Sequence, residues 1–278
     1  MPLFMMISGF VVNVERFKLA SRVKLLIPFF FFGLLYTYLI TEHDFVSFIE
    51  HEAKCGYWFL YAIVVFFFAL WIIRQTKINL TLGIVLFGLF FIGLHALFHR
   101  TTIGTSLSTD HLWQMWLFFS FGIFLRRKGF DILKKHVSRN LVVCVIFTIL
   151  LIIVPMYLPQ NAMTSIGIGT IRCFFISAGF LLLFYALEQY FKPYQSKAKQ
   201  CLKSIGNDVG KNTLQIYVLH YFFLSLIPMK FLGDWMLREN VVWLEYLISP
   251  VLSLIIAYLC IWTARLIYKL HLGFVFGR

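Results

Sequence analysis

Charged side chains are scarce in this sequence, and acidic ones are the scarcest. Only 12 Asp and Glu stand against 25 Lys and Arg, and all charged residues together make up 13% of the chain. Apolar residues account for 60%, 33 residues are Phe, and the mean hydropathy is +0.83. Water-soluble globular proteins carry about 25% charged residues, so this composition excludes that class. The apolar stretches are continuous rather than alternating, so they predict membrane helices and not the strands of a barrel.

Several chemical motifs are missing as well. The five cysteines show no C-x-x-C pair, and only Cys55 lies in an expected outer loop, so no disulfide framework is predicted. We find no glycine-rich phosphate loop, dinucleotide fingerprint or internal repeat. The His and acidic residues of the loop TEHDFVSFIEHEAKCG are of the types that bind metal ions, so a metal site is one interpretation of this loop. The loop lacks a known ligand spacing such as H-E-x-x-H, so we expect a solvated interfacial segment and no metal. The acidic and histidine residues of that loop are Glu42, His43, Asp44, Glu50, His51 and Glu52.

The sequence predicts one all-α domain over residues 1–278, a polytopic helical bundle embedded in a membrane. About 20 apolar residues are needed to cross a hydrocarbon core of roughly 30 Å. Eight full spans and a partial one at the N-terminus are expected. The full spans are 23–40, 57–73, 79–97, 111–125, 140–158, 166–190, 211–231 and 243–268. Loops such as 191–211 are expected to connect them.

The basic residues alternate along the chain with the spans. Twenty of the 25 Lys and Arg fall in five segments, which are 15–24, 74–78, 126–139, 191–211 and 265–278. The positive-inside rule places these segments in the cytoplasm, so the C-terminus is predicted to be cytoplasmic in a multi-pass plasma (inner) membrane protein. The net charge of +13 is therefore mainly a topology signal. We expect no nucleic-acid partner, since no single basic face interleaved with aromatic residues is indicated.

The first residues, MPLFMMISGFVVN, are apolar from the start. This topology requires them to run inward from the outer side, yet 13 helical residues rise only about 20 Å. The segment also lacks the basic region and cleavage site of a signal peptide. We therefore expect that one span precedes it in a complete protein, which then has ten spans and both termini in the cytoplasm.

Three segments resemble the membrane acyltransferase-3 family of O-acyltransferases: MPLFMMISGF, GYWFLYAIV and NTLQIYVLHYFFL, in the family's order. The resemblance implies about ten membrane helices. It also implies transfer of an acyl group, usually acetyl, from cytoplasmic acyl-CoA to a hydroxyl of a surface or exported glycan. In the family, the helix before the SGF element carries a basic residue and, some three turns later, a histidine thought to act in transfer. That helix is absent here, so this chain alone is expected to be inactive.

Two ionisable residues inside predicted spans are candidates for binding substrate, because burying such groups in a membrane is costly. His220 lies near the expected midplane, and Thr213, Tyr217 and His220 follow an i, i+4, i+7 pattern that forms one polar stripe. His220 is predicted to line the acceptor or donor path, with a hydrogen bond to the sugar as one role. A packed histidine satisfied by a neighbouring helix is the alternative. Arg172 is predicted to pair with a phosphate or an acidic group, or else to extend its side chain to the interface.

Other candidates have plainer alternatives. Ser8 invites comparison with a nucleophile, but no G-x-S-x-G elbow surrounds it, so Ser8 and Gly9 suit close helix packing. Trp58 and Tyr61 can hold a sugar ring or anchor the chain at the membrane interface. The cytoplasmic cluster of Arg126, Arg127 and Lys128 is a candidate site for acyl-CoA phosphates, and anionic membrane lipid satisfies the same charges equally well.

The predicted function is therefore an O-acetyltransferase with acetyl-CoA as donor and a polysaccharide or lipid-linked glycan as acceptor. The alternative is a transporter or export subunit for a glycan, lipid or small acid, with His220 and Arg172 in a translocation path. A transporter can show paired broken helices in two related halves, which this sequence does not display. An inert fragment left by an altered gene start agrees with the same family origin.

Overall fold

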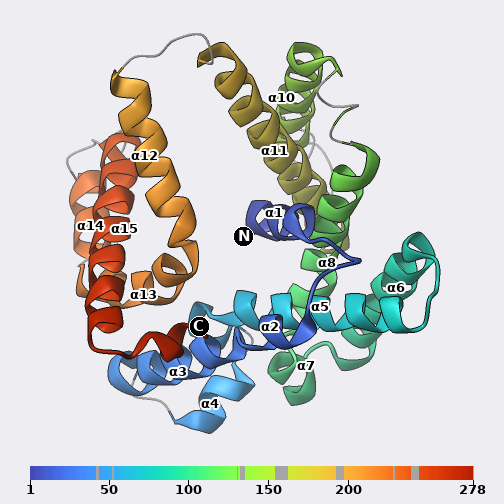
Figure 1. Ribbon diagram of the computed structural model, residues 1–278, viewed down its shortest axis with the longest axis horizontal. Coiled ribbons are helices and arrows are strands. Elements are labelled where there is room, and N and C mark those ends of the chain that lie inside the picture. The colour runs from blue at the N-terminus through green and yellow to red at the C-terminus, as the bar shows by residue number, and fades with distance from the viewer. Residues whose placement is uncertain are drawn as a thin grey trace. The chain divides into compact units, whose positions relative to one another are not determined.

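The computed structural model describes residues 1–278 except 42–43, 52, 130, 132–134, 154–161, 192–196, 228, 239–243 and 278. Every regular element among the described residues is a helix, which confirms the predicted all-α class (Figure 1). The chain divides into two compact units. The first unit comprises Met1–Leu19 and Val65–Lys199, and the second comprises Ala20–Val64 and Gln200–Arg278.

Five helical segments are long and apolar enough to cross a membrane, and they match five of the predicted spans. They are Leu19–Ile40, Trp58–Gln75, Leu80–Phe98, Gly167–Gln189 and Ile248–Lys269. The other three predicted spans contain shorter helices, namely α8 (Thr109–Phe124, 16 residues), α10 (Val137–Ile153, 17 residues) and α13 (Thr213–Leu226, 14 residues). Residues 154–158, the end of one predicted span, lie outside the described residues. The total of eight spans remains a prediction.

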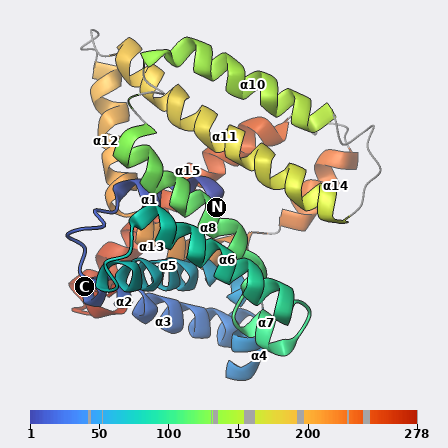
Figure 2. The same ribbon diagram turned by 90° about the vertical axis from the view of Figure 1, so that its right-hand side faces the viewer.

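The first unit is built on α8 and the helices around it. Its other helices are α1 (Pro2–Val11), most of α5 (Trp58–Gln75), α6 (Leu80–Phe98), α7 (Thr102–Ser106), α10 (Val137–Ile153) and α11 (Ala162–Phe191). Helices α10 and α11 lie side by side, as Figure 2 shows. Helix α8 packs against both α1 and α6, so it forms the centre of this unit.

Two glycines let α1 and α8 approach backbone to backbone. A Cβ atom at Gly9 would overlap the carbonyl oxygen of Phe119, and one at Gly122 would overlap the carbonyl oxygen of Met6. Small residues at helix crossings allow this close approach in membrane proteins. The sequence predicted that Ser8 and Gly9 suit close helix packing, and Gly9 does pack closely against α8.

Aromatic side chains fill the space between α5, α6 and α8. The ring of Phe66 lies 5.7 Å from Phe91, 5.2 Å from Trp116 and 5.3 Å from Phe119. The indole of Trp116 donates a hydrogen bond to the carbonyl of Ile84 at 3.0 Å, so its polar atom is satisfied. Phe66, Trp116 and Phe119 are each at most 1% exposed. They give the first unit a rigid centre.

The second unit is arranged around α13. Its other elements are most of α2 (Leu19–Val23), α3 (Leu26–Tyr36) with the π-helical turn Thr37–Thr41, α4 (Phe45–Glu50), the start of α5, most of α12 (Lys197–Lys211), α14 (Met229–Arg238), α15 (Glu245–Lys269) and a final 3-10 turn, Gly273–Phe276. Helix α13 packs against α15 and α3. The final turn buries Phe276 against Phe32 and Tyr268, at ring distances of 5.3 and 5.4 Å, so it closes one end of the unit.

The basic segment 191–211 contains more regular structure than the expected loop. Residues 197–211 form the helix α12. Leu202, Ile205 and Val209 recur at helical spacing among Lys, Gln, Asn and Asp, which is the pattern of an amphipathic helix. The prediction of a loop was wrong here because it considered the charge of the segment and not its periodicity.

Candidate functional site

Polar rings gather in the second unit, where α13 meets α3 and the turn before α5. We call Tyr36, Tyr57, Tyr217, His220 and Tyr221 the tyrosine–histidine cluster. The ring of Tyr221 is central, since it lies 4.0 Å from His220, 5.3 Å from Tyr57 and 5.9 Å from Tyr36. Tyr217 lies 6.3 Å from Tyr57. The cluster is assembled from three separate parts of the chain.

A turn with unusual backbone angles brings a carbonyl group to this cluster. Lys54, Cys55 and Gly56 have consecutive positive φ values of 45°, 50° and 91°. The carbonyl of Gly56 accepts hydrogen bonds from the hydroxyls of Tyr217 at 2.5 Å and Tyr221 at 3.3 Å. A Cβ at Gly56 would overlap the Tyr221 ring, so both the angle and the space require glycine. Backbone strain of this kind is concentrated at functional sites.

Further hydrogen bonds hold the turn in place. Tyr57 is fully buried, and its hydroxyl donates to the carbonyl of Val218 on α13 at 2.7 Å. The hydroxyl of Thr37 lies 2.8 Å from the carbonyl of Gly33 and 3.3 Å from the Sγ of Cys55. These contacts fix the turn to both α3 and α13, so the polar atoms of the cluster are held in defined positions.

The imidazole of His220 is oriented by its own helix. Its Nδ1 lies 2.7 Å from the carbonyl oxygen of Tyr217 and 3.2 Å from that of Ile216. A carbonyl only accepts hydrogen bonds, so Nδ1 must carry the proton. In the neutral ring, Nε2 is then the acceptor, and it forms no hydrogen bond with any described residue. A bond donated by this nitrogen to a sugar would require the protonated ring.

Two of the remaining predicted residues of the second unit lie near this cluster. Trp58 and Tyr61 occupy the first turn of α5, directly after Tyr57. Trp58 is only 9% exposed, and the ring of the half-buried Tyr61 lies 6.0 Å from Phe29. Thr213 does not share the environment of His220, because it is exposed and its hydroxyl bonds to the carbonyl of Gly210 on the preceding turn at 2.8 Å.

A second polar site lies in the first unit. A cavity of about 380 Å³ is lined by Glu15, Arg74, Lys77, Asn79 and Arg127, together with apolar side chains. We call it the basic cavity, because three cationic groups there face one carboxylate. Arg74 also donates to the carbonyl of Phe17 at 3.2 Å, which places its guanidinium. The cavity has the charge and the polar lining that an anionic group needs.

The predicted cluster of Arg126, Arg127 and Lys128 is divided in the structure. All three belong to a π-helical turn, Leu125–Gly129, but only Arg127 lines the basic cavity. The Nη1 of Arg126 donates to the carbonyls of Phe10 at 3.3 Å and Val11 at 2.5 Å. Phe10 and Val11 are the last two residues of α1, so Arg126 caps the C-terminal end of that helix. The side chain of Lys128 lies outside the described residues.

Arg172 and Ser8 also lie in the first unit. Arg172 is half-buried on α11 and forms no hydrogen bond or ion pair with the described part of the chain. Ser8 is half-buried on α1, and no hydrogen bond links its hydroxyl to another described residue. The structure therefore provides neither a partner that would activate Ser8 nor a partner that would neutralise Arg172 among those residues.

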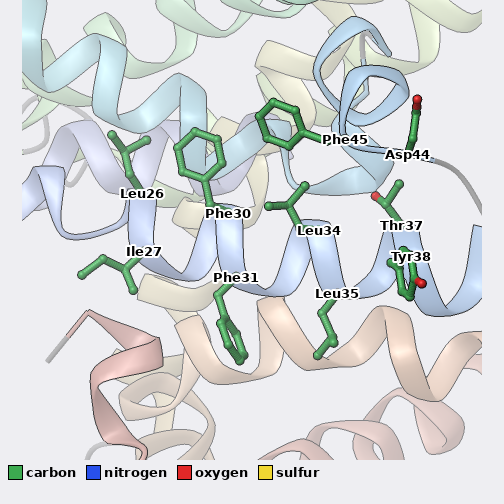
Figure 3. A pocket seen from close by; sticks show the side chains of 10 residues that line it. All are labelled: Leu26, Ile27, Phe30, Phe31, Leu34, Leu35, Thr37, Tyr38, Asp44 and Phe45. Carbon is green, nitrogen blue, oxygen red and sulfur yellow. The ribbon is translucent and has the colours of Figure 1, made fainter.

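An apolar cavity of about 750 Å³ runs along α3 (Figure 3). Its lining includes Phe30, Phe31, Leu34 and Tyr38. At one end Asp44 caps α4 by accepting a hydrogen bond from the Ser47 amide at 2.9 Å. Of the neighbouring residues considered for a metal, Glu42, His43 and Glu52 lie outside the described residues. This cavity offers contact to apolar chains rather than groups for catalysis.

These features define a helical membrane protein that holds polar side chains between its helices, the class that handles polar substrates inside a bilayer. A family model described as an acyltransferase domain matches residues 1–262. The chain belongs to the membrane acyltransferase-3 family, which confirms the resemblance, and it is a membrane acyltransferase. No curated protein and no solved structure matches it.

Sequence reasoning missed several residues of both sites. Tyr221 follows His220 directly and lies four residues after Tyr217, so helical spacing alone was sufficient to add it. Arg74 and Lys77 were counted only as topology signals. Their position opposite Arg127 depends on how α5, α6 and α8 pack, and no local sequence pattern carries that information.

Proposed function

We propose that this protein is an O-acetyltransferase, which transfers an acetyl group from acetyl-CoA to a hydroxyl of an envelope or exported polysaccharide, or of a lipid-linked glycan. Membership of the acyltransferase family supports the reaction class. The observation that carries the proposal is the Nε2 of His220, an acceptor left without a hydrogen bond among the described residues and surrounded by tyrosines.

Attack of a sugar hydroxyl on a thioester requires a proton acceptor, because a hydroxyl is a weak nucleophile at neutral pH. In the proposed reaction, the hydroxyl oxygen forms a bond to the thioester carbonyl carbon, and Nε2 of His220 accepts the hydroxyl proton. The carbon–sulfur bond then breaks, and the proton passes to the departing thiolate of CoA. Trp58, Tyr61 and Tyr217 provide aromatic faces that suit the apolar side of a sugar ring.

The basic cavity is the proposed site for the phosphates of acetyl-CoA. Phosphate groups are bound by Arg and Lys through charge-assisted hydrogen bonds, and Arg74, Lys77 and Arg127 supply such donors. Arg126 is assigned to capping α1 instead. The half-buried Arg172 remains available for a phosphate of the donor or of a lipid-linked acceptor.

The surroundings proposed for these sites are those of a plasma (inner) membrane. In this proposal the basic segments and the C-terminus of the protein lie in the cytoplasm, where acetyl-CoA is available. Membrane lipid is the expected occupant of the apolar cavity along α3, since exposed Phe30 and Phe31 line it. No nucleic-acid partner and no metal requirement for transfer are part of this proposal.

The test uses membranes that contain the full chain, supplied with labelled acetyl-CoA and the host glycan. The family resemblance predicts that this chain alone is inactive, whereas the role proposed for His220 predicts label in the glycan, so this assay decides between the two. Where label appears, we expect His220→Ala to lower the transfer rate by about 10²- to 10⁴-fold while the Kd for acetyl-CoA stays unchanged. Arg127→Gln should raise that Kd. The exposed His136 provides the matched control, so His136→Ala should change neither quantity.

A normal transfer rate in His220→Ala would contradict the role of this residue. Movement of glycan across the membrane without acetylation would contradict the proposed reaction, and it would favour the transporter that the sequence left open.

A further inference from the structure

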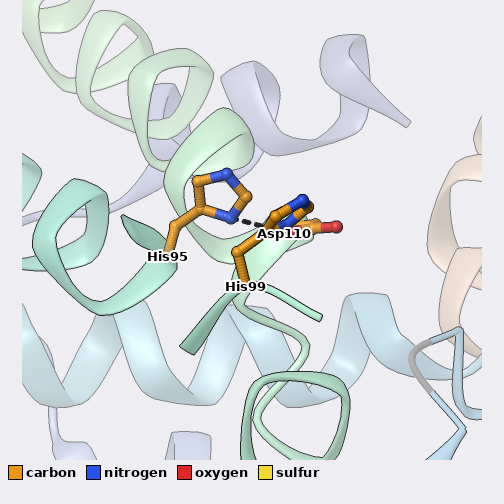
Figure 4. Close-up of side chains that lie close together, drawn as sticks. All are labelled: His95, His99 and Asp110. Atoms are coloured by element: carbon orange, nitrogen blue, oxygen red, sulfur yellow. Dashed lines mark ion pairs between the residues drawn. The ribbon is translucent and has the colours of Figure 1, made fainter. Parts of the chain in front are cut away.

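Three metal-ligating side chains that belong to neither site described above meet in the first unit. His95 lies in the last turn of α6, and His99 is the residue that ends this helix. Asp110 lies in the first turn of α8. The short helix α7 (Thr102–Ser106) connects the two longer helices. Figure 4 shows the two imidazoles and the carboxylate turned toward one point.

The donor atoms converge closely. The Nδ1 of His95 lies 2.5 Å from Oδ1 of Asp110, and the Nδ1 of His99 lies 3.5 Å from the same oxygen. One ligand atom from each residue falls within 4.8 Å of the others. The two histidines are four residues apart, so they share one face of α6. This spacing and the facing carboxylate form a three-ligand set.

The imidazole of His95 is held in place beside the carboxylate of Asp110. The Nδ1 of His95 is buried, and it forms no hydrogen bond of normal geometry within the described residues, although Oδ1 of Asp110 is close. The ring of His95 is held against Trp113 at 5.6 Å, which keeps Nδ1 directed to this point. A buried imidazole nitrogen held beside a carboxylate oxygen and a second imidazole is suited to metal coordination.

We infer that His95, His99 and Asp110 bind one Zn²⁺ ion. Two imidazole nitrogens and one carboxylate oxygen form a ligand set that zinc commonly uses, whereas Mg²⁺ and Ca²⁺ prefer oxygen alone. The side chains of His95, Asp110 and His99 are 25%, 35% and 44% exposed, so solvent reaches the site and an ion can enter. Three protein ligands also leave at least one position for water.

The site joins the end of α6 to the start of α8. The connection between them contains two residues with positive φ, Arg100 at 63° and Ser108 at 52°. A bound ion would hold these helix ends together across that connection. The inference departs from the expectation of no metal, which considered ligand spacing only in the loop TEHDFVSFIEHEAKCG. It stands independently of the proposed transfer reaction.

The experiment uses the full chain in detergent, purified without a polyhistidine tag and treated with a chelator. Co²⁺ serves as the spectroscopic probe for the zinc site. We expect visible d–d absorption bands that saturate at one Co²⁺ per chain and that Zn²⁺ abolishes by displacement. Zn²⁺ at about 100 times its Kd should raise the unfolding midpoint by about 5 °C.

Variants locate the site. His99→Ala removes the most exposed ligand, and Asp110→Asn keeps the shape of the side chain. Each should raise the Kd for Zn²⁺ by at least about tenfold, since changes outside the ligand shell alone cost about 10- to 100-fold. His136→Ala removes an exposed histidine outside the site and should leave the Kd unchanged. Wild-type protein without Co²⁺ bands, or equal zinc affinity in all four proteins, would overturn the inference.

Discussion

Replacing Gly56 by alanine tests whether the tyrosine–histidine cluster depends on its turn. Gly56 has a φ of 91°, and an added Cβ would overlap the ring of Tyr221. Alanine in such a conformation costs about 1–3 kcal/mol. Displacing Tyr221 weakens its 3.3 Å bond to the Gly56 carbonyl, which adds about 1 kcal/mol. The expected loss in the free energy of unfolding is therefore about 2–4 kcal/mol.

Thermal unfolding in detergent, followed by tryptophan fluorescence, measures this loss. A chain of this size shifts by about 2–4 °C per kcal/mol, so the midpoint should fall by about 4–16 °C. Gly93→Ala is the matched control, because this glycine lies inside α6 and no atom within 4 Å faces its missing Cβ. Alanine is about 1 kcal/mol better than glycine within a helix, so the control midpoint should not fall. A Gly56→Ala midpoint as high as that of Gly93→Ala would refute the reasoning.

Three further predictions use the same thermal measurement. Tyr217→Phe removes a 2.5 Å hydrogen bond and should lower the free energy of unfolding by about 1 kcal/mol, more than Tyr221→Phe, whose bond is 3.3 Å; equal losses would contradict this ranking. Arg126→Gln removes the cap of α1 and should cost about 1 kcal/mol after solvent screening, whereas Arg127→Gln, which makes no such bond, should melt like the wild type. Gly122→Ala forces a methyl group into the backbone of α1 and should cost about 1–3 kcal/mol; an unchanged midpoint would show that the two helices can separate freely.

The positions of the long helices followed from the sequence because apolar length is a local signal. The span expected at 79–97 appears as Leu80–Phe98, and the one expected at 57–73 appears as Trp58–Gln75. His220 was recognised for a similar reason, since an ionisable group within an apolar run stands out without knowledge of its neighbours. The structure added which ring nitrogen of His220 carries the proton, because Nδ1 donates a hydrogen bond to the carbonyl of Tyr217, one helical turn earlier.

The turn at Gly56 and the three-ligand site were not predictable in this way. Lys54 and Cys55 adopt positive φ although neither residue type favours it, so contacts of the turn with other elements, such as that of Cys55 with Thr37 and that of Gly56 with α13, hold this conformation. His95 and Asp110 meet only because α7 reverses the chain between α6 and α8. Both features depend on contacts between elements, and a search for short motifs examines one element at a time.

The cap that Arg126 places on α1 also bears on how the protein is made. The guanidinium and the carbonyl that it binds are separated by 115 residues. Ribosomes add about 5–20 residues per second, so roughly 6–23 s pass after Val11 is synthesised before Arg126 exists. The surface of α8 around Gly122, against which α1 packs, appears over the same interval. During that time α1 has neither its cap nor its packing partner, and the insertion machinery or surrounding lipid must hold this short helix until the rest of the unit arrives.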